Sequence, residues 1–250
     1  MIYLNYKGGN IMANLILQEL VPLITAFAIL LNSIGGIFGV VVIPYNPDRV
    51  EVSLGGNVIS DVDEVLEYYN SAVKKTGFVL GTSSYDFSEF TLKESDTDFT
   101  SFVQDYIQGL ESNSTSVFSV PGEGVLTAAD VKSAKMSAED GKTTVIINVK
   151  DYSHGFYDNS SNNPVTNAFG YSTDVNGFFD STGMTITDGD MEFTYTDCVI
   201  SCVIDDRSGK IIYGDWDTTC SADVENLAIS VYDTELIMDF CFKMESHIDI

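Results

Sequence analysis

The C-terminal third of the chain alternates apolar and polar residues on both sides of a turn, and this pattern constrains the fold most. Residues 206–210, DRSGK, are typical of a three-residue hairpin loop with Gly209 in the left-handed conformation. Successive side chains of a strand point to opposite faces, so the even-numbered residues beside this turn share one apolar face. Pairing outward from Asp206 and Lys210 matches Ile204 with Ile212, Cys202 with Gly214, Ile200 with Trp216 and Cys198 with Thr218. The turn and the hydrophobic pattern therefore predict the same antiparallel hairpin.

The alternation continues on both sides of this hairpin. Before it, the apolar positions change from odd to even numbers, which predicts a β-bulge near Thr196–Asp197 that bends the strand. After it, the last strand directs alternate residues inward: Leu236, Met238, Phe240, Phe242 and Met244. The C-terminal part is therefore expected to form a curved antiparallel meander.

A helix over residues 61–75 is predicted by an apolar stripe at helical spacing. Ser60 is the expected N-cap with Asp63 three residues on, and Gly77 follows the end. The stripe consists of Val62, Val65, Leu66, Tyr69 and Val73. Further expectations are helices at 99–110 and 126–134, strands at 83–92 and 143–151, and a long loop over 152–185. The predicted fold class is α+β: a curved antiparallel β-sheet meander with an amphipathic helix on its concave face, preceded by one apolar N-terminal helix.

Residues 20–44 contain no charged side chain and are long enough to cross a bilayer as a helix. A membrane anchor and a cleaved signal peptide both fit this segment, and a buried core helix is the third alternative. The expected organisation is an N-terminal tail (1–19), the anchor or signal segment (20–44), a linker (45–57) and an extracytoplasmic α+β domain (58–250). Of the 37 acidic residues, three precede position 55: Glu19, Asp48 and Glu51. The acidic part of the chain is therefore expected outside the cell membrane, or secreted if the segment 20–44 is cleaved.

The charge balance excludes one class of partner. The chain has 12 Lys and Arg against 37 Asp and Glu, a net charge of −25. Such a surface repels phosphate backbones and anionic lipid headgroups, so nucleic-acid binding is not expected. The acids are spread along the chain and indicate a solvated globular surface.

The four cysteines and two histidines do not form a recognisable reactive motif. The hairpin register directs Cys198 and Cys202 into the core, where free thiols are the first reading; a Cys198–Cys220 disulfide across the hairpin is the alternative. A zinc site would need four converging Cys or His ligands, so no metal or other cofactor is expected. Ser71-Ala-Val-Lys74 matches an acyl-transfer signature without its companion motifs, and no other catalytic motif is present, so the protein is not expected to be an enzyme.

Three stretches carry a resemblance to a known group: Tyr69-Asn70-Ser71-Ala72, Pro121-Gly122 with Leu126 to Val131, and Phe193 to Trp216. In these three stretches, and in the order in which they follow one another, the chain resembles uncharacterised secreted or membrane-tethered proteins of Gram-positive anaerobes. That resemblance implies an extracytoplasmic location and, because the group has no known activity, no mechanism. In architecture alone the predicted fold is similar to lipoprotein-carrier and mycobacterial glycolipid-carrier folds, which hold acyl chains between sheet and helix.

These observations predict a non-catalytic extracytoplasmic domain that is attached to the membrane through residues 20–44 and works by binding; no protein partner is identified. The alternative is a carrier of an apolar or lipid ligand held between sheet and helix. Its candidate lining residues are Trp216, Phe240, Phe242 and Met244. An ordinary hydrophobic core is the favoured interpretation of the same four residues.

Overall fold

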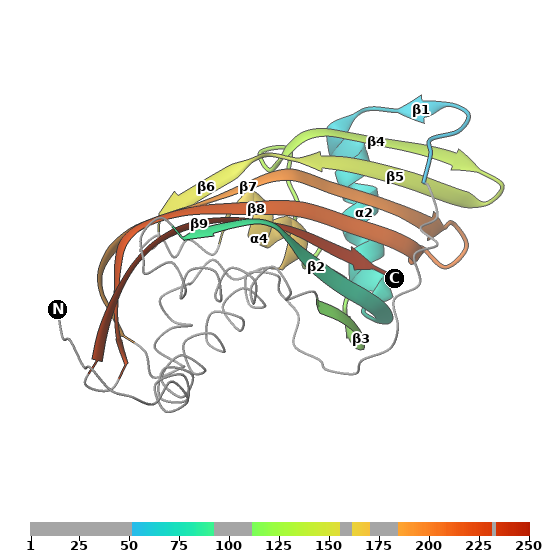
Figure 1. Ribbon diagram of the computed structural model, residues 1–250. Coiled ribbons are helices and arrows are strands. Elements are labelled where there is room, and N and C mark those ends of the chain that lie inside the picture. The colour runs from blue at the N-terminus through green and yellow to red at the C-terminus, as the bar shows by residue number, and fades with distance from the viewer. Residues whose placement is uncertain (1–51, 93–111, 156–161, 171–184, 232–233) are drawn as a thin grey trace, which may run out of the picture.

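The computed structural model describes residues 52–92, 112–155, 162–170, 185–231 and 234–250 (Figure 1). The predicted anchor or signal segment (20–44), the predicted helix at 99–110 and parts of the 152–185 stretch lie outside these ranges. The described part is dominated by one antiparallel sheet, as the alternation predicts.

The sheet contains nine strands among the described residues. They are β1 (Val58–Ile59), β2 (Phe78–Leu92), β3 (Ser112–Ser119), β4 (Val131–Glu139), β5 (Lys142–Val149), β6 (Tyr152–Gly155), β7 (Thr185–Asp205), β8 (Lys210–Val231) and β9 (Thr234–Asp249). Their spatial order is β1-β4-β5-β7-β8-β9-β2-β3, and β6 pairs with β7 beyond the end of β5. The long strands β7, β8 and β9 run along the whole sheet and bend strongly, so the sheet is arched (Figure 1).

The hairpin of β7 and β8 confirms the predicted pairing over most of its length. Ile200 pairs with Trp216 and Cys202 with Gly214. Gly209 has a φ of 64°, the left-handed conformation that the turn requires. Next to the turn the register differs by one residue: Ile204 pairs with Ile211 rather than Ile212, because a bulge follows Val203. This bulge lets Ile211 reach the core, where it is buried, and leaves Ile212 exposed.

The predicted bulge in β7 is also confirmed. The register shifts between Thr196 and Val199, and Asp197 has a φ of 52°. The extra residue moves the buried positions from odd to even numbers, so Tyr195 and Cys198 both face the core.

Helix α2 (Val62–Thr76) agrees with the predicted helix to within one residue. The N-cap is Asp61 rather than the expected Ser60: the Asp61 carboxylate accepts a hydrogen bond from the Glu64 backbone N–H at 3.1 Å. The helix lies across the strands, on the side toward which the sheet bends (Figure 1). We call this side the inner face. The helix buries Val65, Leu66, Tyr69, Ala72 and Val73 against it.

Two further sequence predictions were wrong. Residues 126–134 do not form a helix: Thr127 and Asp130 make the expected cap-like bonds, with Asp130 accepting from the Thr127 N–H at 2.9 Å, but they close a turn that leads into β4. The 152–185 stretch is not all loop, since it contains β6 and the short helix α4 (Pro164–Phe169). Asn163 caps α4 and Gly170 ends it in the left-handed conformation.

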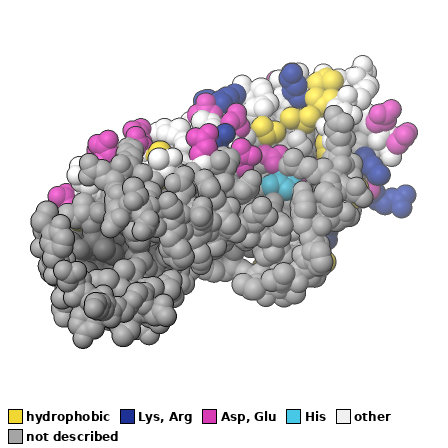
Figure 2. All heavy atoms as spheres, in the orientation of Figure 1, with side chains coloured by type: hydrophobic (Ala, Val, Ile, Leu, Met, Phe, Trp, Pro, Cys, Tyr) yellow, Lys and Arg dark blue, Asp and Glu magenta, His cyan; other side chains and the backbone are white. Residues whose placement is uncertain are grey.

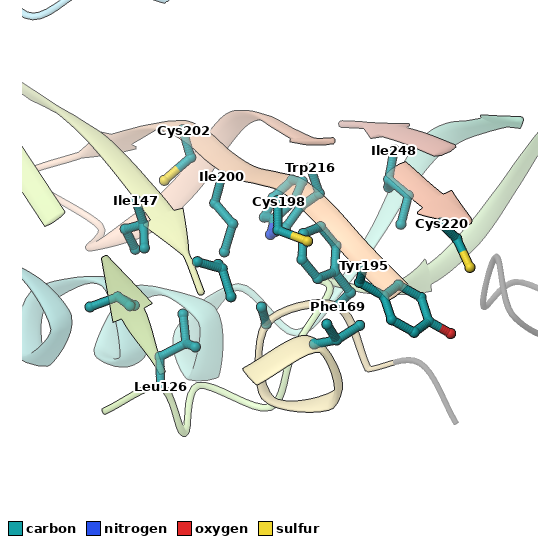
Figure 3. Close-up of a cluster of buried hydrophobic side chains, with 14 of the residues drawn as sticks. Leu126, Ile147, Phe169, Tyr195, Cys198, Ile200, Cys202, Trp216, Cys220 and Ile248 are labelled. Atoms are coloured by element: carbon teal, nitrogen blue, oxygen red, sulfur yellow. The ribbon is translucent and has the colours of Figure 1, made fainter. Parts of the chain in front are cut away.

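The hydrophobic core lies between the inner face and the two helices (Figure 3). Helix α2 packs against β4 and β8, and α4 packs against β5 and β7. Side chains from the sheet, among them Ile147, Ile200 and Trp216, point toward these helices (Figure 3).

Candidate functional site

The four residues predicted to line a ligand cavity are all buried on the inner face, but they do not form one lining. Trp216 is fully buried under α2, where its indole N–H donates a hydrogen bond to the Tyr69 hydroxyl at 3.1 Å. Trp216 pairs with Ile248, whereas Phe240 pairs with Val224, eight positions further along the sheet. At about 3.3 Å per residue this separation is about 26 Å. Trp216 is therefore a core residue beneath the helix, apart from the other three.

Phe240, Phe242 and Met244 form a continuous apolar row on β9. The rings of Phe240 and Phe242 stack with centroids 6.5 Å apart. Across the sheet they lie next to Val224 and Ala222 on β8, which are also buried. This row, with its two β8 neighbours, is the part of the predicted site that the structure brings together, and we call it the β9 apolar row.

The cysteines are free thiols, and Cys198, Cys202 and Cys220 are buried. We call these three the core thiols. Cys198 lies beside Thr218, with Sγ and Oγ1 3.0 Å apart, whereas Cys220 pairs with Tyr195 (Figure 3). The Cys198–Cys220 disulfide that the sequence allowed is thus not formed in this structure.

Burial makes the core thiols poor nucleophiles. Desolvation disfavours the thiolate and raises the pKa of Cys198 to about 11 and that of Cys220 to about 12. The pKa of Cys202 is raised by the same cause. Because the thiolate is the reactive form, these residues act as small apolar core side chains.

The outer face, opposite α2, carries a polar cluster that the sequence reasoning did not find. His247 on β9 lies among three aspartates of β8 and β9: its Nδ1 is 2.6 Å from Asp217, and its Nε2 is 3.5 Å from Asp215 and 3.7 Å from Asp249. The Tyr213 hydroxyl donates a hydrogen bond to Asp215 at 2.7 Å. The sequence contained a signal for this cluster, because Asp215 and Asp217 alternate on one strand as His247 and Asp249 do on another.

The geometry of this cluster favours a structural network over a catalytic triad. In a triad the histidine nitrogen that does not contact the aspartate reaches a nucleophilic hydroxyl or thiol. Here that nitrogen, Nε2, faces the carboxylates of Asp215 and Asp249. In the β8–β9 ladder Asp215 lies opposite Asp249, and Asp217 lies opposite His247. The cluster therefore joins β8 to β9 on the outer face.

The second histidine is part of the core. His154 on β6 is buried and stacks on Phe193 with ring centroids 5.3 Å apart and on Tyr195 at 6.0 Å. Its Nδ1 lies 3.0 Å from the Gly155 carbonyl oxygen. This position fits an aromatic core residue better than a metal ligand.

Across the described ranges, no group of three or more His, Cys, Asp or Glu side chains has the arrangement that would hold a metal ion. The helices in the same ranges are also too short or too polar to cross a membrane. Compared with protein-family models, curated proteins and solved structures, the chain matches none.

Proposed function

We propose that this protein is a non-catalytic extracytoplasmic domain that is tethered to the membrane by residues 20–44 and acts by binding. The observation that carries the proposal is the uncharged segment 20–44, followed by an acidic β-rich domain. As a helix that segment would be about 37 Å long, which exceeds the roughly 30 Å hydrocarbon core of a bilayer.

The chemistry of the described residues supports a binding role rather than a catalytic one. The core thiols are buried and have raised pKa values, which removes them as nucleophiles. The Nε2 of His247, which in a catalytic triad reaches a nucleophile, faces the carboxylates of Asp215 and Asp249 instead.

The tether is tested by alkaline extraction of membranes from cells that produce the full chain. We expect the parent protein to stay in the membrane pellet and the variant Ile29→Arg/Leu30→Arg to be released, because each Arg at the centre of a span costs about 2.5–3.5 kcal/mol. The matched control, Ile2→Arg/Leu4→Arg, changes the predicted tail and should remain in the pellet. Release of the parent protein would contradict the tether, and an N-terminus that begins after residue 30 would identify a cleaved signal instead.

The second candidate function is a carrier of an apolar ligand, and the β9 apolar row favours it. Stacked Phe240 and Phe242, with Met244, are buried apolar side chains of the kind that acyl chains contact in carrier folds. Helix α2 packs against β4 and β8, and α4 packs against β5 and β7, so neither helix has its main contacts on β9. A ligand between sheet and helices would therefore find its apolar contacts at this row, away from Trp216.

The carrier function is tested with radiolabelled palmitate and the full chain in mild detergent. We expect saturable binding to the parent protein and at least tenfold weaker binding to Phe240→Ala/Phe242→Ala. The control, Ile147→Ala, removes a comparably buried side chain beneath the helices and should retain binding. Equal binding by the parent and by both variants would contradict the carrier.

A further inference from the structure

Four parts of the chain meet at one end of the sheet. The turn between β4 and β5 contacts the turn between β7 and β8, where the Asp206 N–H donates to the Gly141 carbonyl oxygen at 3.0 Å. The last residue of α2 contacts the start of β8, where the Ile211 N–H donates to the Thr76 hydroxyl at 2.8 Å. β2 begins directly after α2, at Phe78. Figure 1 shows these parts together at the end of the arch where the C-terminus lies.

This end collects the basic residues of a strongly acidic protein. Five of the 12 Lys and Arg lie here: Lys74, Lys75, Lys142, Arg207 and Lys210. None of the five makes an ion pair within the described ranges. Figure 2 shows Lys and Arg side chains projecting at this end, with acidic ones beside them.

The acidic residues of the β7–β8 turn are engaged by neighbouring groups of the protein. Asp205 accepts hydrogen bonds from the Ser208 N–H at 2.8 Å and the Ser208 hydroxyl at 2.6 Å. Asp206 accepts from the hydroxyls of Tyr68 at 3.0 Å and Thr143 at 2.7 Å. These bonds fix both carboxylates at the turn, but Asp206 stays exposed, as do Glu139 and Asp140 of the β4–β5 turn and the five basic side chains.

Large apolar side chains are exposed at the same end. Phe78 is 77 % exposed, Leu80 67 % and Ile212 51 %. Phe78 and Leu80 lie on β2 beyond Thr82, the residue that pairs with Asp249 near the end of β9, and Ile212 lies at the bulge that follows Val203. We call these three residues with the five basic ones the basic–apolar tip. Exposed aromatic and aliphatic side chains beside lysines are the composition of surfaces that contact lipid headgroups.

The chain enters the described domain at this end as well. The Gly55 N–H donates a hydrogen bond to the Ser137 hydroxyl at 3.1 Å, near the end of β4, and Val58 pairs with Ser137. A tether at residues 20–44 therefore joins the domain within about ten residues of the tip. This step rests on the proposed tether.

We infer that the basic–apolar tip rests on the surface of an anionic phospholipid bilayer, so that the arched sheet stands end-on above the membrane. The lysines and Arg207 meet the lipid phosphates, and Phe78, Leu80 and Ile212 enter the interface. The tether raises the effective concentration of the tip at the bilayer, which offsets the repulsion that the net charge of −25 produces. The aspartates around His247 start about 7 Å behind Leu80 on the same outer face, since Thr82, two residues after Leu80, pairs with Asp249.

The inference is tested with the full chain in vesicles of phosphatidylcholine, with or without phosphatidylglycerol, that contain brominated lipid. Phe78→Trp places a fluorophore at the tip, and the signal of Trp216, the chain's one native tryptophan, is subtracted by means of the parent protein. The matched control is Ser153→Trp, an exposed position on β6 about 35 Å from the tip. We expect brominated lipid to quench the Phe78→Trp signal at least threefold more than the control, and only in vesicles with phosphatidylglycerol. Lys142→Glu/Lys210→Glu should abolish the difference, whereas Lys135→Glu/Lys150→Glu should preserve it.

Flotation of the same vesicles separates this inference from the proposed tether. Protein that floats with the vesicles but shows equal quenching at both positions overturns the tip assignment and leaves the tether intact. Protein that does not float overturns both. Quenching that is independent of phosphatidylglycerol contradicts recognition of anionic lipid, and a blue shift at Phe78→Trp without lipid quenching would assign the tip to a second copy of the chain.

Discussion

The hydrogen bond between Trp216 and Tyr69 joins the sheet to α2, and its removal provides a direct test of how the two layers are held. Tyr69 is 1 % exposed and Trp216 is 0 % exposed, so water cannot replace either partner. Among the described residues, Tyr69 is the hydrogen-bond acceptor for the indole N–H. The substitution Tyr69→Phe keeps the ring and its packing but leaves this N–H without a partner.

The loss of stability expected for Tyr69→Phe follows from the burial of these two side chains. An unsatisfied buried donor destabilises a protein by about 1–3 kcal/mol. For a domain of this size, each kcal/mol lowers the melting temperature by about 2–4 °C, so we expect a decrease of about 2–12 °C. The neighbouring residue provides the matched control, because Tyr68 donates its hydroxyl to Asp206 in a solvent-accessible position. Tyr68→Phe should therefore cost at most about 1 kcal/mol.

Trp216 is the only tryptophan, so its fluorescence reports this contact directly during unfolding in urea. Circular dichroism provides a second probe and permits a double-mutant cycle with Trp216→Phe, for which we expect a coupling energy of about 1 kcal/mol. If Tyr69→Phe costs no more than Tyr68→Phe, the hydrogen bond does not hold the helix to the sheet.

Three further predictions address the core, a close contact and a turn. The core thiols should react with iodoacetamide at pH 8 at least a hundredfold more slowly in the native protein than in urea, because burial raises their pKa values; equal rates would contradict their burial. Gly214→Ala should destabilise the protein by about 1–3 kcal/mol, since a Cβ there would lie 2.5 Å from the Trp216 ring, whereas Gly155→Ala, with 3.8 Å to its nearest neighbour, should be close to neutral in thermal unfolding. The hydrogen bonds from Ser208 lower the pKa of Asp205, so their stabilisation is present at neutral pH and is lost as the pH falls through the lowered pKa. Ser208→Ala should therefore destabilise the protein at pH 7 and have less effect at pH 2, and a pH-independent effect would contradict this linkage.

The features that the sequence predicted well depend on local pattern. The β7–β8 hairpin could be predicted because its turn residues and its alternation act over the same few positions. Helix α2 could be predicted equally well, since its apolar stripe, its terminal charges and Gly77 all lie within a short segment. The bulge at Asp197 was visible as a change in the parity of the buried residues.

The errors occurred where long-range pairing overrides a local signal. Thr127 and Asp130 have the spacing of a helix cap and make the corresponding hydrogen bonds, but β4 pairs with β5, and that pairing determines the structure of the residues that follow. The register slip at Ile211 has a similar origin, because contact with Thr76 of α2 fixes the start of β8.

The same distinction explains why both surface features were missed. The His247 cluster and the basic–apolar tip each draw residues from strands that are far apart in the sequence, and their members look like ordinary solvated side chains when taken singly. Lys75 lies next to the turn that carries Arg207 only because α2 ends against the β7–β8 turn, where a Cβ on Gly209 would lie 2.8 Å from the Lys75 Nζ. Their proximity is therefore a consequence of the packing of helix on sheet. A surface of this kind can recognise a partner only after the domain has folded, so variants that loosen α2, such as Tyr69→Phe, should also weaken contact between the tip and anionic lipid.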